Sequence, residues 1–226
     1  MNTMKNSKKI KLLLATLFLS AAGVFAQENF FGDIGVTKNL TSSTEWNQSV
    51  YGHFKHFFSE DGWYRFGASY TLTRNVKNWG IQAGLLTERT FDDSIDNYWE
   101  IRPWVGLTLS NDISSKLKFQ QFFKFEWRNL LFAGDLENQS TTRTRYKIMP
   151  VYDVGNNWSV YTSYEWYIQP NTDLGARFIN SREWNLGFNK KMEKFTLNFN
   201  YTRERFNEVV LSDATKGNTF SITFIF

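Results

Sequence analysis

The sequence lacks cysteine altogether and has only two histidines and three prolines among its 226 residues. Without cysteine, the chain can form neither a disulfide framework nor a metal site with thiolate ligands. Two histidines are too few for a histidine-rich metal centre, so the sequence predicts no metal and no cofactor. The scarce prolines matter below, because two of them fall inside expected strands.

Beyond its first 26 residues, the sequence carries no excess of positive charge. The formal net charge is +4, but Lys5, Lys8, Lys9 and Lys11 all lie in the first 26 residues, which contain no acidic residue. The rest of the sequence carries as many acidic as basic side chains. The basic pI therefore gives no support for a nucleic-acid partner.

Long apolar runs are absent apart from a short one near the start. After residue 26, no segment approaches the ~18 apolar residues of a membrane-spanning helix. Near the start, a basic stretch precedes apolar residues 12–19, and Val24-Phe25-Ala26 offers a cleavage site before Gln27. The pattern predicts a signal peptide over residues 1–26 and an exported chain over residues 27–226. A retained membrane anchor is the alternative, and a lipoprotein anchor is excluded because no cysteine follows.

The sequence is instead rich in aromatic residues and in period-two alternation. Aromatic residues make up 18% of the chain. Apolar and polar residues alternate over many segments, which is typical of strands with one apolar face. Turn residues separate eleven such segments, at 30–38, 44–58, 64–73, 78–89, 98–109, 116–130, 142–152, 158–169, 181–189, 195–205 and 217–226.

The segment lengths and connections favour a membrane barrel over a soluble sandwich. Many segments have ten or more residues, whereas soluble strands average about five to six and a tilted membrane strand needs about 9–11. Short and longer connections alternate along the chain, as do the periplasmic turns and outer loops of such barrels. The sequence therefore predicts an all-β fold, an antiparallel transmembrane β-barrel of about 10–12 strands.

The tryptophans fall in two tiers, as two interfacial aromatic girdles would. The tier beside short turns comprises Trp46, Trp79 and Trp158. The tier beside long loops comprises Trp63, Trp99, Trp127, Trp166 and Trp184. The alternative is that these side chains fill the core of a sandwich, but such a core would not need them in two rows.

The last ten residues have the strongest strand pattern. Phe220, Ile222, Phe224 and Phe226 share one face, and the sequence stops on Phe226. This ending resembles the closing strand of bacterial outer-membrane barrels, in which a terminal Phe is the usual assembly signal. The resemblance implies a location in the bacterial outer membrane, contact with its lipid and recognition by the barrel-assembly machinery.

Two features do not fit a regular barrel. Pro103 and Pro150 lie inside expected strands, so bulges are expected there. The segment 30–38 would begin on the side of the long loops, outside the cell. Either this segment is not a wall strand or one strand is missing, because an even number of strands is the rule.

Several short motifs resemble the domain-of-unknown-function family numbered 2490, small exported β-barrels without an established activity. Arg143-Thr144-Arg145-Tyr146 opens a strand with an Arg-x-Arg-aromatic motif, and similar elements occupy 122–128, 164–166 and 182–188. The resemblance covers most of the mature chain and implies its fold and location. Glu183 departs from the pattern, because the family tends to repeat a basic residue beside Arg182.

The polar faces of the later strands predict a charged lumen. A basic wall is expected from Lys118, Lys124, Arg128, Arg143, Arg145 and Lys147, and an acidic wall from Glu165, Glu183 and Glu204. One interpretation is a small passive channel for polar or anionic solutes. The alternative is a lumen closed by ion pairs such as Arg145–Glu165, in a scaffold barrel that serves a surface assembly.

A third interpretation is an outer-membrane lipid-modifying hydrolase. Ser49 and His53 share one face of an expected strand. Residues four apart on a strand are separated by about 13 Å, which is too far for a direct nucleophile–base pair. Only a partner on another strand could complete such a site, so no catalytic residue is assigned and a non-enzymatic role is predicted.

Overall fold

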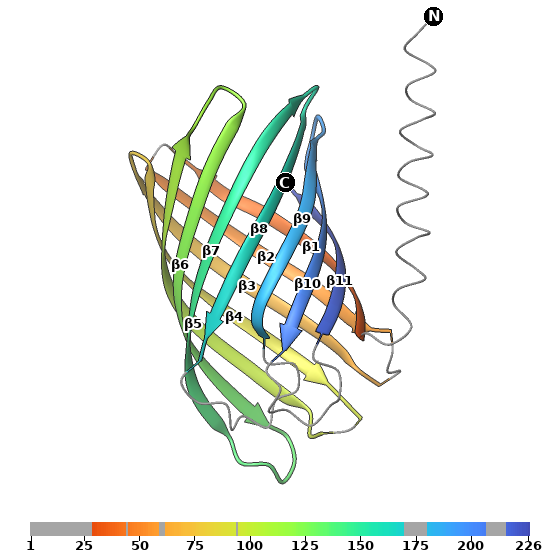
Figure 1. The fold of residues 1–226 in the computed structure, drawn as a ribbon. Helices are drawn as coiled ribbons and strands as arrows, with labels where there is room; N and C mark the ends of the chain where they lie inside the picture. Colours follow the sequence, from red (N-terminus) through yellow and green to blue (C-terminus); the bar gives the residue numbers. More distant parts are fainter. Residues whose placement is uncertain (1–28, 44, 59–61, 94, 170–179, 207–215) are drawn as a thin grey trace, which may run out of the picture.

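The computed structural model describes residues 29–43, 45–58, 62–93, 95–169, 180–206 and 216–226. Within them, eleven strands form one closed barrel (Figure 1). The predicted signal peptide lies outside the described residues. In the part of the chain that is described, no helix has the length and apolar character needed to cross a membrane. The strands are β1 (Asn29–Ser42), β2 (Trp46–Phe57), β3 (Tyr64–Val76), β4 (Trp79–Phe91), β5 (Tyr98–Asp112), β6 (Leu117–Phe132), β7 (Gln139–Gly155), β8 (Trp158–Ile168), β9 (Asn180–Lys191), β10 (Thr196–Phe206) and β11 (Lys216–Ile225).

The barrel closes through a parallel seam between its first and last strands. Each strand pairs antiparallel with the next, but β1 pairs parallel with β11, from Asn29↔Gly217 to Thr37↔Ile225. The backbone of Phe226 extends this seam, because its N–H donates to Thr37 O and its carbonyl accepts from Asn39 N, both at 2.9 Å. The segment expected at 30–38 is therefore a wall strand, and an even strand number is not needed to remove both sheet edges.

The prediction of bulges at the two prolines is wrong. Register is the same on both sides of Pro103, with Ile101↔Asn129 and Trp104↔Glu126, and only the pairing between them is interrupted. Pairing with β8 is likewise interrupted at Pro150 without a change of register. A proline removes one backbone donor, and the missing bond does not require an extra residue in the strand.

The wall is apolar outside and polar inside. Large apolar side chains such as Ile34, Phe66 and Val105 are about half exposed on the outer surface, whereas Glu100 and Glu165 are fully buried in the lumen. This distribution is the reverse of that in a soluble protein, where charged residues are almost never fully buried. It is the arrangement of a β-barrel that spans a membrane.

The tryptophans occupy both ends of the outer wall, with one correction. Seven are exposed on the surface near strand ends: Trp46, Trp79, Trp99, Trp127, Trp158, Trp166 and Trp184. Trp63, expected in the girdle near the long loops, is 2% exposed and packs inside with Phe31, Phe57 and Phe206. It lies two residues before Arg65, which faces the lumen, and side chains two apart point the same way.

Candidate functional site

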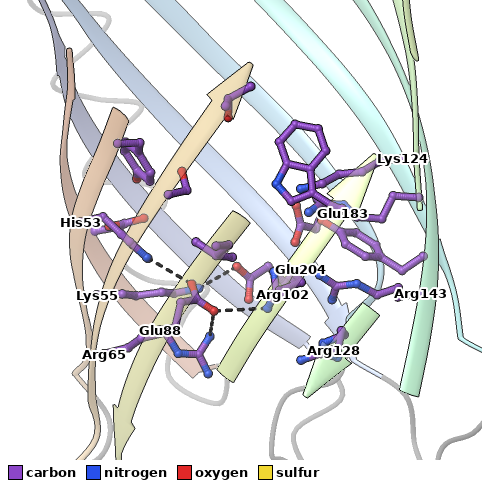
Figure 2. Close-up of a pocket in the computed structure, with 18 of the residues that line it drawn as sticks. His53, Lys55, Arg65, Glu88, Arg102, Lys124, Arg128, Arg143, Glu183 and Glu204 are labelled. Carbon is purple, nitrogen blue, oxygen red and sulfur yellow. Dashed lines mark hydrogen bonds and ion pairs between the residues drawn. The ribbon is translucent and has the colours of Figure 1, made fainter. Parts of the chain in front are cut away.

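A layer of charged side chains crosses the lumen in the half of the barrel near the long loops (Figure 2). Because side chains alternate between the two faces of each strand, the inward positions of neighbouring strands meet at one level. We call this layer the charged waist. It comprises Asp33, His53, Lys55, Arg65, Glu88, Glu100, Arg102, Lys124, Glu126, Arg128, Arg143, Arg145, Lys147, Glu165, Glu183 and Glu204.

Glu126 on β6 is the centre of the basic side of the waist. Its carboxylate accepts from Arg143 Nε at 2.7 Å, from Lys124 Nζ at 2.9 Å and from Arg145 Nη1 at 3.3 Å. Arg102 lies slightly farther away, with Nη1 at 3.9 Å. Glu126 is 0% exposed, so one buried carboxylate carries the charge compensation for several cations.

Two more carboxylates extend the network toward the first strands. Glu100 binds Arg128 through both of its oxygens, with Nε–Oε1 at 2.5 Å and Nη2–Oε2 at 3.1 Å. Arg102 bridges Glu100 at 2.8 Å and Glu88 at 3.2 Å. Figure 2 shows Glu88 held between Arg102, Arg65 and His53. Bidentate geometry of this kind fixes both position and orientation.

The predicted acidic wall is a row of directly opposed carboxylates. Glu183 on β9 is the register partner of Glu165 on β8 and of Glu204 on β10. Arg145 Nε lies 2.7 Å from Glu165, the pair named in the closed-lumen interpretation, and Lys147 lies 3.5 Å from it. Lys55 reaches across to Glu204 at 3.0 Å. The two walls therefore contact each other at Arg145–Glu165.

Aromatic rings support the cations of the waist. The guanidinium groups of Arg143 and Arg145 lie 4.9 and 4.7 Å from the ring centre of Tyr167. Lys124 Nζ lies 4.1 Å from the ring of Trp104. Cation–π contacts at these distances stabilise desolvated cations and restrict their side-chain motion. The basic side is thus a rigid, positioned surface.

Lys118 lies apart from the other residues of the predicted basic wall. It is near the start of β6, at the short-turn end, where its half-exposed ammonium lies 3.7 Å from Asp112. Lys118 has the same inward parity as Lys124 and Arg128, but it lies closer to the short-turn end of β6 and therefore at a different level along the barrel axis. Parity from sequence gives the face of a strand and not the level at which a residue meets its neighbours.

Two cavities meet at the waist. Their volumes are about 500 and 580 Å³. Both are lined by Asp33, Lys55, Arg145, Glu183 and Glu204. Toward the short turns, the lining is mainly uncharged and polar, and includes Thr73, Asn75, Gln82, Thr108, Ser110 and Gln120.

Aromatic residues narrow the lumen beyond the waist, next to the long loops. Phe31, Phe57, Trp63 and Phe206 form one buried cluster, and Tyr98 and Leu130 form another. Phe31 and Phe57 stack with ring centres 4.6 Å apart. Bulky apolar side chains of the described residues therefore occupy the lumen on the long-loop side of the waist.

The histidine considered for catalysis is held between two carboxylates. His53 Nδ1 lies 3.1 Å from Asp33 and Nε2 lies 3.2 Å from Glu88. Both ring nitrogens are thus engaged away from Ser49, and the structure does not assemble the Ser49–His53 pair. Among the residues that the structure describes, no group of three or more potential ligands is arranged to hold a metal ion.

The sequence interpretation missed four residues that organise the waist: Glu88, Glu100, Arg102 and Glu126. All four have inward parity. Glu126 lies on β6, which carries part of the predicted basic wall, and Glu100 and Arg102 lie on the neighbouring strand β5. The acidic members of this group could have been found by asking which carboxylates compensate the six predicted cations. Their exact pairings depend on strand register, which alternation alone does not provide.

A solved structure described as the NanC porin has the same fold. Its similarity to this chain has a TM-score of 0.54 at 13% sequence identity, and covers 86% of this chain and 96% of the porin chain. No curated protein matches this chain.

The family comparison agrees with the motifs seen in the sequence. A model of the family described as protein of unknown function, DUF2490, matches residues 28–209. The matched region contains β1 to β10 and every residue of the charged waist. This protein belongs to the DUF2490 family.

Proposed function

We propose that this protein is a narrow channel of the bacterial outer membrane that passes small polar solutes, with a preference for anions. The observation that carries the proposal is the meeting of two polar cavities at the waist, where Arg145 and Lys55 face both. The fold shared with a porin supports a passive role without catalysis. The apolar exterior and exposed tryptophans support the membrane location.

The charge arrangement supports the preference for anions. The arc of β5, β6 and β7 contributes Arg102, Lys124, Arg128, Arg143, Arg145 and Lys147 to the waist, against Glu100 and Glu126 on the same strands. Charges in a low-dielectric constriction focus the field and concentrate counter-ions. A small anion passing the waist would lie along this arc, opposite the carboxylate row of Glu165, Glu183 and Glu204.

Reversing one charge at the waist tests the channel proposal. We expect Arg145→Glu to lower the anion-to-cation permeability ratio by about tenfold, because Arg145 faces both cavities and the field there is poorly screened. The measurement is the reversal potential of single channels in a planar bilayer under a salt gradient. Lys118→Glu is the matched control, since it makes the same charge change at an exposed site and should leave the ratio within about twofold.

A milder variant protects this test against misfolding. Arg145→Gln removes the charge without placing a new carboxylate beside Glu165, and should shift the ratio in the same direction by a smaller amount. Equal ratios for wild type, Arg145→Gln and Arg145→Glu, all folded and conducting, would contradict an anion-selective waist.

A closed barrel that supports a surface assembly is the second candidate. The observation in its favour is the burial of the network: Glu126 is fully buried, and Arg128 and Arg143 are less than a tenth exposed. This candidate expects a folded barrel that shows no conductance steps at any salt concentration. Steps whose size scales with salt would support the channel instead.

A further inference from the structure

Two apolar side chains face the lumen on β6 and β7, just beyond the waist toward the short turns. Phe122 and Met149 have the inward parity of Lys124 and Lys147, and each lies two residues nearer to the short-turn end. The interior of an outer-membrane barrel is ordinarily polar, so large apolar residues at these positions are unexpected. They line a recess of about 230 Å³ together with Gln82, Thr108, Gln120 and Lys147. We call this space the side recess.

The side recess adjoins the other cavities of the lumen. Phe122 also lines the cavity of about 500 Å³ at the waist, and Lys147 and Met149 also line the cavity of about 580 Å³. A solute in either cavity is therefore next to the recess. Pockets for drug-sized ligands typically measure about 300–1,000 Å³, so the recess suits a smaller molecule.

The ring of Phe122 lies over a glycine of the neighbouring strand. A Cβ atom at Gly106 on β5 would be only 3.1 Å from Cε2 of Phe122, so a larger residue there would displace the ring. Trp104 contacts the same ring edge-on, with ring centres 6.4 Å apart and an interplanar angle of 86°. This is a favourable aromatic geometry. Phe122 is thus positioned by its neighbours and is still partly exposed.

Lys147 supplies a positive charge beside this apolar surface. Its side chain is 27% exposed, against 17% for Arg145 and 11% for Lys124, and is the most exposed of the cations in the charged waist. Its Nζ lies 5.6 Å from the ring centre of Phe122. The ion pair with Glu165 is long, at 3.5 Å, and that carboxylate also binds Arg145 at 2.7 Å. Because an ammonium has three donors, Lys147 can bind a further anion.

The remaining lining is neutral and can form hydrogen bonds. Gln82, Thr108 and Gln120 border the recess on the side of the short turns. Of the residues that the structure describes, none of those lining the recess is acidic. The recess therefore combines an apolar surface, one accessible cation and neutral polar groups.

We propose that the side recess binds a small carboxylate with an apolar body, such as an aromatic monocarboxylic acid. The carboxylate pairs with Lys147 in a charge-assisted hydrogen bond, and the apolar body lies against Phe122 and Met149. A thioether adapts to ligands of different shape. The inference rests on the proposed channel and narrows its anions to those with an apolar part.

Isothermal titration calorimetry of the purified protein in detergent micelles tests this proposal, with protein-free micelles as the blank. Benzoate is the probe, benzamide has the same ring without the charge, and acetate has the charge without the ring. We expect benzoate to bind at least about tenfold more tightly than either, because only benzoate uses both the cation and the apolar surface. Equal affinity of benzoate and acetate, or of benzoate and benzamide, would overturn the proposal.

Two substitutions locate the binding in the recess. Lys147→Gln should weaken benzoate binding about tenfold, to the level of benzamide, because it removes the charge-assisted bond. Phe122→Thr should weaken benzoate binding about fivefold and leave acetate binding unchanged, because it removes apolar surface only. Thr is well suited to a strand. If this variant does not fold, Met149→Gln replaces it, with the same expected direction.

Matched controls make the same chemical changes outside the recess. Lys118→Gln lies on β6 at the short-turn end, and Phe123→Thr changes the neighbouring residue that faces the lipid. Both should bind benzoate within about twofold of wild type. Folded recess variants that bind as tightly as wild type, or control variants that lose as much affinity, would contradict a site at Lys147 and Phe122.

Conductance of the same preparations separates this inference from the channel itself. Benzoate binding by a barrel without conductance steps would support the recess and reject the channel. Anion-selective conductance without tighter binding of benzoate would support the channel and reject the recess. In a conducting barrel with an occupied recess, benzoate should reduce the chloride current at concentrations at which acetate does not.

Discussion

Glu126→Gln should lower the free energy of unfolding by about 3–5 kcal/mol, the usual cost of leaving a buried charge without its partner. The substitution keeps the shape of the side chain but removes the charge that Arg143, Arg145 and Lys124 share. Their mutual repulsion then acts among buried side chains, where charges are screened less than in bulk water. Denaturant-induced unfolding in vesicles, followed by tryptophan fluorescence, measures the change.

Two further variants show whether this loss comes from the network. Glu193→Gln makes the same chemical change at an exposed position in the β9–β10 turn and should change stability by less than about 0.5 kcal/mol. Glu126→Gln/Arg143→Gln removes a carboxylate and one of its cations together, and should recover part of the loss, with a coupling energy of about 0.5–3 kcal/mol. A loss at Glu126 no larger than that at Glu193, or strictly additive effects in the double variant, would contradict the role of Glu126 as shared counter-charge.

A disulfide across the seam should stabilise the barrel by about 3–5 kcal/mol. Ile34 and Ile222 are register partners on β1 and β11, and both face the lipid. Ile34→Cys/Ile222→Cys would close a loop of about 190 residues, and the loss of unfolded-state entropy grows with loop length. The native sequence contains no cysteine, so the engineered pair has no competing thiol. Oxidised and reduced protein are compared by denaturant unfolding.

An off-register pair shows whether the seam has the register seen here. Ile34→Cys/Phe220→Cys shifts one partner by two residues, which moves the Cα atoms about 8 Å apart and beyond the reach of a disulfide. This pair should stay reduced under conditions that oxidise the first pair. Rapid cross-linking of the off-register pair, or none in the first, would show that β1 and β11 do not pair in this parallel register.

Alternation along the chain was sufficient to predict the barrel and most of its strand boundaries. The segment expected at 158–169 is β8 at Trp158–Ile168, and the segment expected at 217–226 is β11 at Lys216–Ile225. These predictions are possible because the barrel wall separates a polar lumen from an apolar exterior, so each position of a strand favours either a polar or an apolar residue. The same rule assigns Arg143, Arg145 and Glu165 to one face of their strands without any knowledge of their neighbours.

Features that depend on register or on contact between distant strands could not be read from alternation. The direction of the β1–β11 pairing leaves no trace in the pattern of either strand. The girdle prediction for Trp63 rests on its closeness to a long loop. Whether its side chain faces the lumen or the outer surface depends instead on its parity with Arg65, which faces the lumen. Glu126 was visible as a polar residue on an inward face, but its several cations come from β5, β6 and β7. Such contacts depend on the register between neighbouring strands.

The parallel seam also determines the order in which the barrel can be completed. Strands β2 to β10 can each acquire two neighbours by adding hairpins in sequence, but β1 must wait for β11, which is separated from it by almost the whole chain. Contacts between such distant residues form slowly, because a long loop must close first. Until then, both edge strands carry unpaired backbone groups that lipid cannot satisfy. We therefore expect membrane insertion and closure of this barrel to be coupled. A chain that ends before β11 would have open sheet edges and would not be stable in the bilayer.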